Sequence, residues 1–218
     1  MNFKCMTPED IAKKLLEIKA VAVNMDEPFT YTSGLRSPIY CDNRLIISYP
    51  EIRNAVADAF VDLIKEKNIE FDVIGGPATG AIPHSAWVAD KLGVPMIYIR
   101  GKAKGHGKKN LVEGVLQKGQ KVLILEDLIS TGGSSLTAIE GVRDEGGVVT
   151  DCVAISTYEM ESSKKGFTRA NVNLYTLTNF SAIVNAAVET GALAEDQKEK
   201  VLEWNQDPEG WGKKMGLE

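Results

Sequence analysis

The chain has few of the residues that cross-link or anchor unusual proteins. Its 218 residues include three cysteines and two histidines. The cysteines, Cys5, Cys41 and Cys152, lie far apart and form no CxxC pair. This argues against a disulfide framework or a zinc site and favours a reducing cytoplasm. No apolar run approaches the roughly 20 residues of a membrane span, and no apolar stretch of a signal peptide is expected at the N-terminus.

The sequence also lacks an excess of positive charge. It has 25 Lys and Arg against 30 Asp and Glu, for a net charge of −5. This disfavours a nucleic-acid coat, because neutralising phosphates requires a basic surface. An anionic ligand in a local basic pocket remains compatible with it. No linker, repeat or low-complexity tract divides the chain, which predicts a single domain over residues 1–218.

Helical and strand-like segments alternate, which predicts an α/β sheet protein. Thr7, Pro8 and Asp10 form a capping-box-like start of a first helix, and a second helix follows Pro50. Trp204 and Trp211 in the C-terminal part are expected to be packing anchors. Strands are predicted at residues 71–74, 95–99, 121–125, 148–157 and 172–177, further helices at 86–92 and up to 145–147, and two C-terminal helices across 179–210, joined near Gly191.

The strongest local pattern is VLILEDLISTGGSS, residues 122–135. An apolar run typical of a central parallel strand is followed by two carboxylates, Glu126 and Asp127. Ligands of open α/β sheets bind at the carboxyl ends of strands, where glycines and a helix N-terminus can hold a phosphate. Acids beside an anion site are suited to a ligand that also carries hydroxyls or a divalent cation, as a sugar phosphate with magnesium does. The alternative is a plain βα turn, and neither the P-loop nor the GxGxxG pattern is present.

This stretch resembles the diphosphoribosyl-binding signature of type I phosphoribosyltransferases. In that family the two acids bind the ribose hydroxyls of 5-phosphoribosyl 1-diphosphate, and the following loop holds the 5-phosphate. The resemblance implies a central, mostly parallel sheet flanked by helices, with an N-terminal hood at about residues 1–45 and a flexible catalytic loop at about 100–110. It places the contacts to 5-phosphoribosyl 1-diphosphate on Glu126, Asp127, Leu128, Ile129, Ser130, Thr131, Gly132, Gly133 and Ser134.

A second pattern, RGKAKGHGKKN at residues 100–110, concentrates basic residues and glycines in an acidic chain. Taken alone it predicts either a lid that closes on a diphosphate or a solvated basic loop. Its spacing is similar to the catalytic loop of orotate phosphoribosyltransferases, which reaches into the partner subunit's site. The resemblance implies that Arg100, Lys104 and His106 contact the diphosphate, and that the protein is a homodimer with a loop shared between subunits.

Two further segments resemble the same family. Residues 28–44, PFTYTSGLRSPIYCDNR, look like the hood over the pyrimidine, and purine-specific members carry different hoods. The resemblance places Tyr40 and Cys41 at the border of the orotate pocket, although plain packing is about as good an account of both. The turn GGPATGAIP at residues 75–83 corresponds either to the diphosphate-binding loop or to a structural strand-to-helix turn.

The chain departs from the family at two positions. Many members have a second lysine in the catalytic loop where this chain has Gly101, with Lys102 one position later. Several members have an orotate-contacting arginine where this chain has YEM, residues 158–160. Ser130 is then the best remaining side-chain contact to the base.

The resemblance implies an orotate phosphoribosyltransferase of pyrimidine (UMP) biosynthesis, which makes orotidine 5-phosphate and diphosphate. Catalysis falls on Lys104, His106 and Asp127, with Mg2+ carried by the diphosphate and no direct protein ligand. The alternatives are a phosphoribosyltransferase for another base, against which the hood argues, and a non-catalytic regulator that senses 5-phosphoribosyl 1-diphosphate, against which the loop argues. A cytoplasmic homodimer is expected, without a nucleic-acid or membrane partner.

Overall fold

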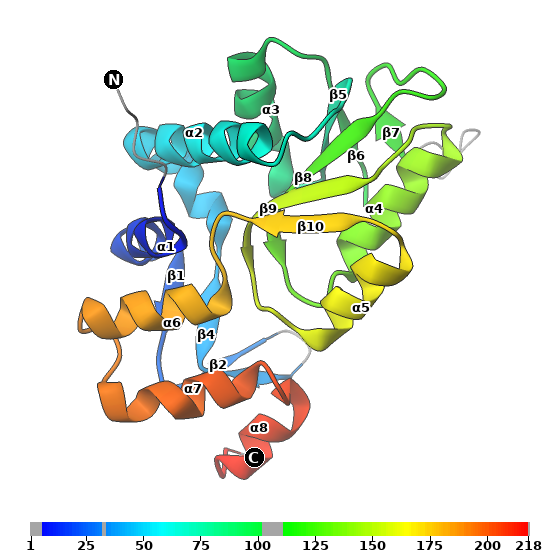
Figure 1. Cartoon of the computed structure of the whole chain (residues 1–218). Coiled ribbons are helices and arrows are strands. Elements are labelled where there is room, and N and C mark those ends of the chain that lie inside the picture. Colours follow the sequence, from blue (N-terminus) through cyan, green and yellow to red (C-terminus); the bar gives the residue numbers. More distant parts are fainter. Residues whose placement is uncertain (1–5, 32–33, 102–110, 218) are drawn as a thin grey trace.

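A six-stranded sheet forms the centre of the molecule (Figure 1). The structure is a computed structural model that describes residues 6–31, 34–101 and 111–217. The strand order is β10-β9-β8-β5-β6-β7, and all strands are parallel except the edge strand β7, which is antiparallel to β6. The strands are β5 (Val73–Pro77), β6 (Met96–Ile99), β7 (Val112–Glu113), β8 (Val122–Ile129), β9 (Asp151–Thr157) and β10 (Asn173–Thr176).

Helices cover both faces of this sheet, because its central strands are apolar on both faces. Leu123 and Leu125 of β8 belong to one core with Phe60 of α2, whereas Val122 and Ile124 belong to a second core on the side of α4. This alternation follows from the two-residue period of a strand. The helices are α1 (Pro8–Glu17), α2 (Pro50–Glu66), α3 (Ala81–Leu92), α4 (Gly133–Asp144), α5 (Glu161–Arg169), α6 (Phe180–Glu189), α7 (Lys198–Trp204) and α8 (Pro208–Lys214).

The first helix, α1, begins as its sequence predicts. The Asp10 amide donates to Thr7 Oγ1 at 3.2 Å and the Thr7 amide donates to Asp10 Oδ2 at 3.1 Å, so the capping box of α1 is confirmed. Pro50 occupies the first turn of α2, also as predicted. Of the helices described, none combines the length and the apolar character needed to cross a membrane.

The C-terminal part differs from its prediction. Residues 179–210 were expected to hold two helices, but the structure has α6, α7 and α8, with α8 continuing to Lys214. The additional helix, α8, begins at Pro208 because Asp207 caps it by accepting the Gly210 amide at 3.0 Å and Pro208 suits the first helical position. Trp204 and Trp211 are fully buried, which confirms their role as packing anchors.

The hood strands, β1 to β4, form two small sheets of their own. In one, β1 pairs with β4, and in the other β2 pairs with β3; both pairs are antiparallel. In Figure 1 β1 and β4 run past α6, to the lower left of the central sheet, and β2 lies just above α7. Their bounds are β1 (Val21–Val23), β2 (Phe29–Thr30), β3 (Arg36–Ser37) and β4 (Ile39–Cys41), and a 3-10 helix, η1 (Asn43–Ser48), leads from β4 to α2.

Candidate functional site

A cavity of about 250 Å³ opens at the carboxyl ends of β5, β6 and β8. Open α/β sheets bind their ligands at this edge. The cavity brings together three of the patterns found in the sequence: the turn after β5, the start of the basic segment after β6, and the paired acids of β8. Its lining residues are Pro77, Ala78, Thr79, Gly80, Ile99, Arg100, Gly101, Glu126, Asp127, Leu128, Ser134, Thr137 and Ala138.

The paired acids lie inside β8 and not after it. The sequence predicted a strand ending at residue 125, but β8 continues to Ile129 because β9 pairs with it as far as Thr157. Glu126 is 5% exposed, and Ser135 Oγ donates to its Oε1 at 2.7 Å. Burial, and then the charge of the neighbouring Asp127, raises the pKa of Glu126 to about 8. Without a cation in the cavity, Glu126 therefore keeps its proton at neutral pH.

Asp127 faces the turn that follows β5. The Leu128 amide donates to Asp127 Oδ1 at 2.9 Å, and burial raises the pKa of this carboxyl above its ordinary value. A Cβ at position 80 would overlap Asp127 Oδ2, so only glycine lets the turn approach the acid so closely. The adjoining peptide bond between Ala78 and Thr79 is cis. The carboxylate and the turn thus lie against each other in the lining of the cavity.

The loop after β8 leads into the N-terminus of α4. Ile129 is fully buried at the end of the strand, whereas Thr131 is exposed. Gly132, at the N-cap of α4, has a φ of +84°, a left-handed conformation that glycine adopts without strain. Within the described residues no side chain caps this helix, so its first N–H groups and positive dipole end are free for an anion. Gly133 begins the helix and Ser134 lines the cavity.

Arg100 lies where β6 meets the basic segment. Its amide donates to the Leu111 carbonyl at 2.9 Å, and its Nη1 donates to Glu113 Oε1 of β7 at 3.2 Å. Arg100 and Leu111 are thereby held side by side, and Arg100 lines the cavity. Lys104 and His106 lie outside the described residues.

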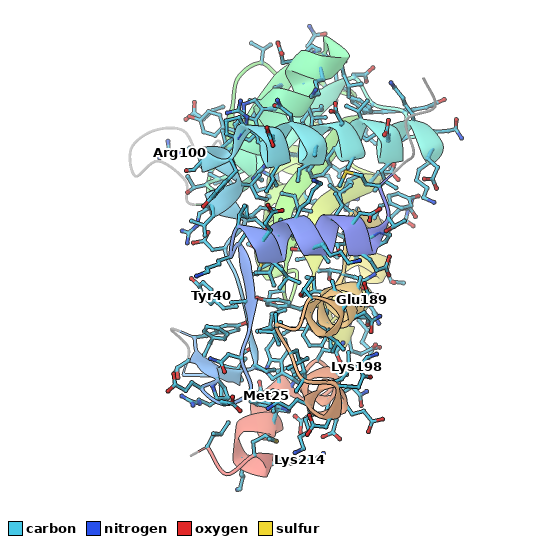
Figure 2. The ribbon with its side chains drawn as sticks, turned by 90° about the vertical axis from the view of Figure 1, so that its left-hand side faces the viewer. Met25, Tyr40, Arg100, Glu189, Lys198 and Lys214 are labelled. Carbon is cyan, nitrogen blue, oxygen red and sulfur yellow. The ribbon has the colours of Figure 1, made fainter. Side chains whose placement is uncertain are left out.

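The two hood residues singled out by the sequence lie in β4. Tyr40 is 42% exposed, and its ring packs on those of Phe29 and Tyr31 at centroid distances of 5.6 and 6.4 Å. The Cys41 thiol is 3.8 Å from Ser156 Oγ, and burial raises its pKa to about 12, so the thiol is neutral. Figure 2 shows Tyr40 on the same side of the molecule as Arg100.

Asn43 is the site residue that the sequence interpretation missed. It is 2% exposed, and its Nδ2 donates to the Asp127 carbonyl at 2.6 Å and to Ser156 Oγ at 3.0 Å. These bonds tie the segment after the hood to the strand that carries the acids. The available signal was its position two residues after Cys41 in a run of polar residues, where a buried amide requires partners.

Residues 158–160 are not among the residues that line the cavity. Tyr158 is 3% exposed, and its hydroxyl lies 3.1 Å from that of Tyr31. Glu159 accepts from the amide and the hydroxyl of Ser181, at 2.8 and 2.6 Å, at the start of α6. Met160 Sδ is 3.9 Å from Ser130 Oγ. Residues 158–160 are thus taken up by aromatic, capping and sulfur contacts within the fold.

Comparison with known proteins agrees with this geometry. The sequence model of the phosphoribosyl transferase domain matches residues 46–185. The orotate phosphoribosyltransferase of Coxiella burnetii is 52% identical over 202 residues, which are 93% of this chain and 97% of that protein. The chain belongs to the orotate phosphoribosyltransferase family. The enzyme of the same name from Enterococcus faecalis is 51% identical over 203 residues, with the same coverage.

Solved structures show the same fold. The UMP synthase of Leishmania donovani superposes with a TM-score of 0.77 at 26% identity, covering 92% of this chain and 42% of that one. The orotate phosphoribosyltransferase of Aeropyrum pernix superposes with a TM-score of 0.72 at 27% identity, covering 83% of this chain and 98% of that one. The predicted fold class and family resemblance are therefore confirmed.

Proposed function

We propose that this protein transfers the ribose 5-phosphate group from 5-phosphoribosyl 1-diphosphate to orotate, giving orotidine 5-phosphate and diphosphate in pyrimidine biosynthesis. The observation that carries the proposal is a single cavity walled by two adjacent carboxylates, the uncapped start of α4 and the turn at Gly80. Its occurrence in a chain about half identical to orotate phosphoribosyltransferases supports the choice of base.

Fixing the ribose falls to β8 and the loop after it. Glu126 and Asp127 bind the 2- and 3-hydroxyls, because carboxylates accept charge-assisted hydrogen bonds from them. The 5-phosphate lies on residues Ile129 to Ser134, at the end of β8 and the start of α4, where the N–H groups and dipole of α4 face it. The anomeric carbon is thereby held in one orientation toward the base, and this orientation lowers the barrier.

The leaving diphosphate lies between the turn at Thr79 and Gly80 and the basic segment. Arg100, Lys104 and His106 stabilise the charge that grows on it in the transition state. Closure of that segment excludes water from the reacting carbon.

The walls of the cavity fit a magnesium ion carried by the diphosphate. Glu126 is buried and Asp127 is partly buried, burial raises the pKa of both carboxyls, and a nearby cation favours their charged forms. When bound, Mg2+ neutralises charge on the diphosphate and assists its departure. We place the ion mainly on the diphosphate oxygens, with no direct protein ligand, because Mg2+ commonly keeps substrate phosphates and waters as ligands.

The base lies under the hood, next to Tyr40, Cys41 and Ser130. The half-exposed ring of Tyr40 offers a face for a planar pyrimidine, and the neutral Cys41 thiol adds no charge beside it. The purine-specific and regulatory alternatives are disfavoured by the family assignment. An assay of diphosphate release with orotate, uracil, adenine and guanine tests this conclusion. We expect turnover with orotate alone, and faster turnover with another base would contradict it.

We further propose a cytoplasmic homodimer, each subunit a single domain, in which the basic segment of one subunit serves the partner's site. Arg100 and Leu111, on either side of the residues outside the description, are held together by a backbone hydrogen bond. Separately, η1 and the residue after it expose three large apolar side chains that a partner subunit could cover: Leu45, Ile47 and Tyr49. Nucleic acid and membrane are not expected as partners.

Mixing two inactive variants tests the shared site. Lys104→Ala removes a cation from the diphosphate, and Asp127→Asn weakens the ribose contacts; each alone should lose on the order of a hundredfold or more in activity. In a mixed dimer one site receives both intact residues. Random exchange should therefore restore up to about a quarter of wild-type activity, since half the dimers are mixed and each has one good site. An inactive mixture with exchange verified by mass spectrometry would place the loop in its own subunit's site.

A further inference from the structure

The hood hairpin of β2 and β3 is supported by the C-terminal helices. Trp204, the last residue of α7, donates its Nε1–H to the Arg36 carbonyl of β3 at 3.0 Å. Helix α8 lies so close that a Cβ at Gly212 would be 3.1 Å from the Arg36 side chain. Figure 1 shows α7 and α8 directly below the hood strands, and Figure 2 shows the same neighbourhood from the side.

Trp204 is also the centre of an aromatic cluster. Its side chain is fully buried. Its ring meets those of Tyr31 and Tyr158 edge to face, at centroid distances of 6.3 and 5.3 Å, and that of Phe180 at 5.7 Å. Such pairs contribute roughly 0.5–1.5 kcal/mol each beyond the area they bury. One residue of α7 thus packs against Tyr31 of the hood, Tyr158 directly after β9, and Phe180 of α6.

Tyr31 connects Trp204 to Tyr40, whose ring is proposed to face the base. Its hydroxyl donates to the Ile39 carbonyl of β4 at 2.8 Å and accepts from Ser37 Oγ at 3.2 Å. Its ring packs on that of Tyr40 at 6.4 Å. A chain of direct contacts therefore runs from Trp204 through Tyr31 to Tyr40.

We propose that Trp204 is a positioning residue for orotate: it fixes the hood hairpin, and thereby the Tyr40 face, without touching substrate. This rests on the proposed role of Tyr40. The ribose and phosphate contacts come from β8 and α4, which have supports of their own in the central sheet. The matched family region, residues 46–185, contains those elements but neither the hood strands nor Trp204. Loss of the Trp204 support should therefore weaken orotate binding selectively.

The second tryptophan of the same segment provides a matched control. Trp211 Nε1 donates to the Lys200 carbonyl at 2.9 Å, and its side chain is 1% exposed. That bond joins α8 to α7. Although α8 packs against Arg36, no ring contact joins Trp211 to Tyr31 or Tyr40 among the described residues, so its loss leaves the contacts from Trp204 to Tyr40 in place. In both Trp204→Phe and Trp211→Phe an aromatic ring remains and one buried N–H donor is lost, so the two variants should lose similar stability.

Steady-state kinetics of the two variants separate positioning from plain stability. Trp204→Phe should raise the KM for orotate roughly three- to tenfold, the scale of one net hydrogen bond. Its KM for 5-phosphoribosyl 1-diphosphate should stay within about twofold of wild type, and Trp211→Phe should leave both constants within that range. An unchanged orotate KM in Trp204→Phe, or an equal rise of both constants, overturns the proposal.

Two more variants keep the test decisive. Tyr158→Phe keeps the ring but removes the hydroxyl beside Tyr31, so it should raise the orotate KM in the same direction even if Trp204→Phe folds poorly. If Tyr158→Phe also leaves that constant unchanged, the proposal fails. Tyr40→Ala tests the proposed role of Tyr40 itself. A normal orotate KM in Tyr40→Ala refutes the role of the Tyr40 face. A raised orotate KM in Tyr40→Ala together with a normal orotate KM in Trp204→Phe refutes only the support by α7.

Discussion

Replacing Asn43 by alanine should impair the proposed ribose site, because it removes a buried support for the backbone of Asp127. The amide is 2% exposed and donates to the Asp127 carbonyl at 2.6 Å and to Ser156 Oγ at 3.0 Å. Alanine leaves a buried acceptor without this donor, which costs about 1–3 kcal/mol in unfolding free energy. It also frees the backbone of Asp127 to shift, and a misplacement of about 1 Å is enough to cost on the order of a hundredfold in rate.

We therefore expect Asn43→Ala to lower kcat/KM for 5-phosphoribosyl 1-diphosphate by about ten- to a hundredfold. Urea unfolding monitors the stability loss, and initial rates of orotidine 5-phosphate formation monitor activity. The control is Asn179→Ala, which removes the N-cap of α6, where Asn179 Oδ1 accepts the Ala182 amide at 2.9 Å. That change costs about 0.5–2 kcal/mol away from the cavity.

A comparison of Asn43→Ala with Asn179→Ala separates a role of Asn43 in the site from a purely structural role. If Asn43→Ala is destabilised as expected but its kcat/KM stays within about threefold of that of Asn179→Ala, Asn43 is a structural residue only. Asn43→Asp should be worse than alanine, because it places a carboxylate against the Asp127 carbonyl. Equal activity of the aspartate and wild-type proteins would contradict the hydrogen-bond assignment.

Two further predictions concern the cavity walls. Gly80→Ala should lose activity on the order of a hundredfold or more, because its Cβ displaces the Asp127 carboxylate; wild-type rates would refute the close approach. Between about pH 4.5 and 8 the folded protein holds a proton on Glu126 that the unfolded chain has released, so the unfolding free energy should fall as pH rises through this window. Glu126→Gln, which can still accept from Ser135, should show a shallower fall in pH-dependent urea unfolding, and identical slopes would contradict the raised pKa.

The central strands and the turn between β8 and α4 were predictable because their information is local. Residues 122–135 contain a strand, a turn and a helix start in one run, and the structure keeps that order in β8 and α4. The C-terminal helix count was predictable in principle, since Asp207 and Pro208 form an ordinary helix start.

The missed features depend on contacts between distant residues. Asn43 lies 84 residues before the carbonyl it binds, and no periodicity marks such a pair. The strand β7 has two residues and exists through its pairing with β6. The continuation of β8 through the acids likewise depends on β9, which supplies partners as far as Thr157. Tertiary pairing overrode the turn-like composition of these residues.

The contact between Trp204 and Arg36 joins a residue that is translated early to one that is translated late. The two residues are 168 positions apart. At ribosomal rates of ~5–20 residues per second, roughly 8 to 34 s pass between their additions to the chain. During that interval the sheet and the ribose site, which end by residue 185 of the matched region, can form without the tryptophan. The β2–β3 hairpin is thus among the first parts to be translated, and its hydrogen bond to Trp204 can form only after every strand of the central sheet has been translated.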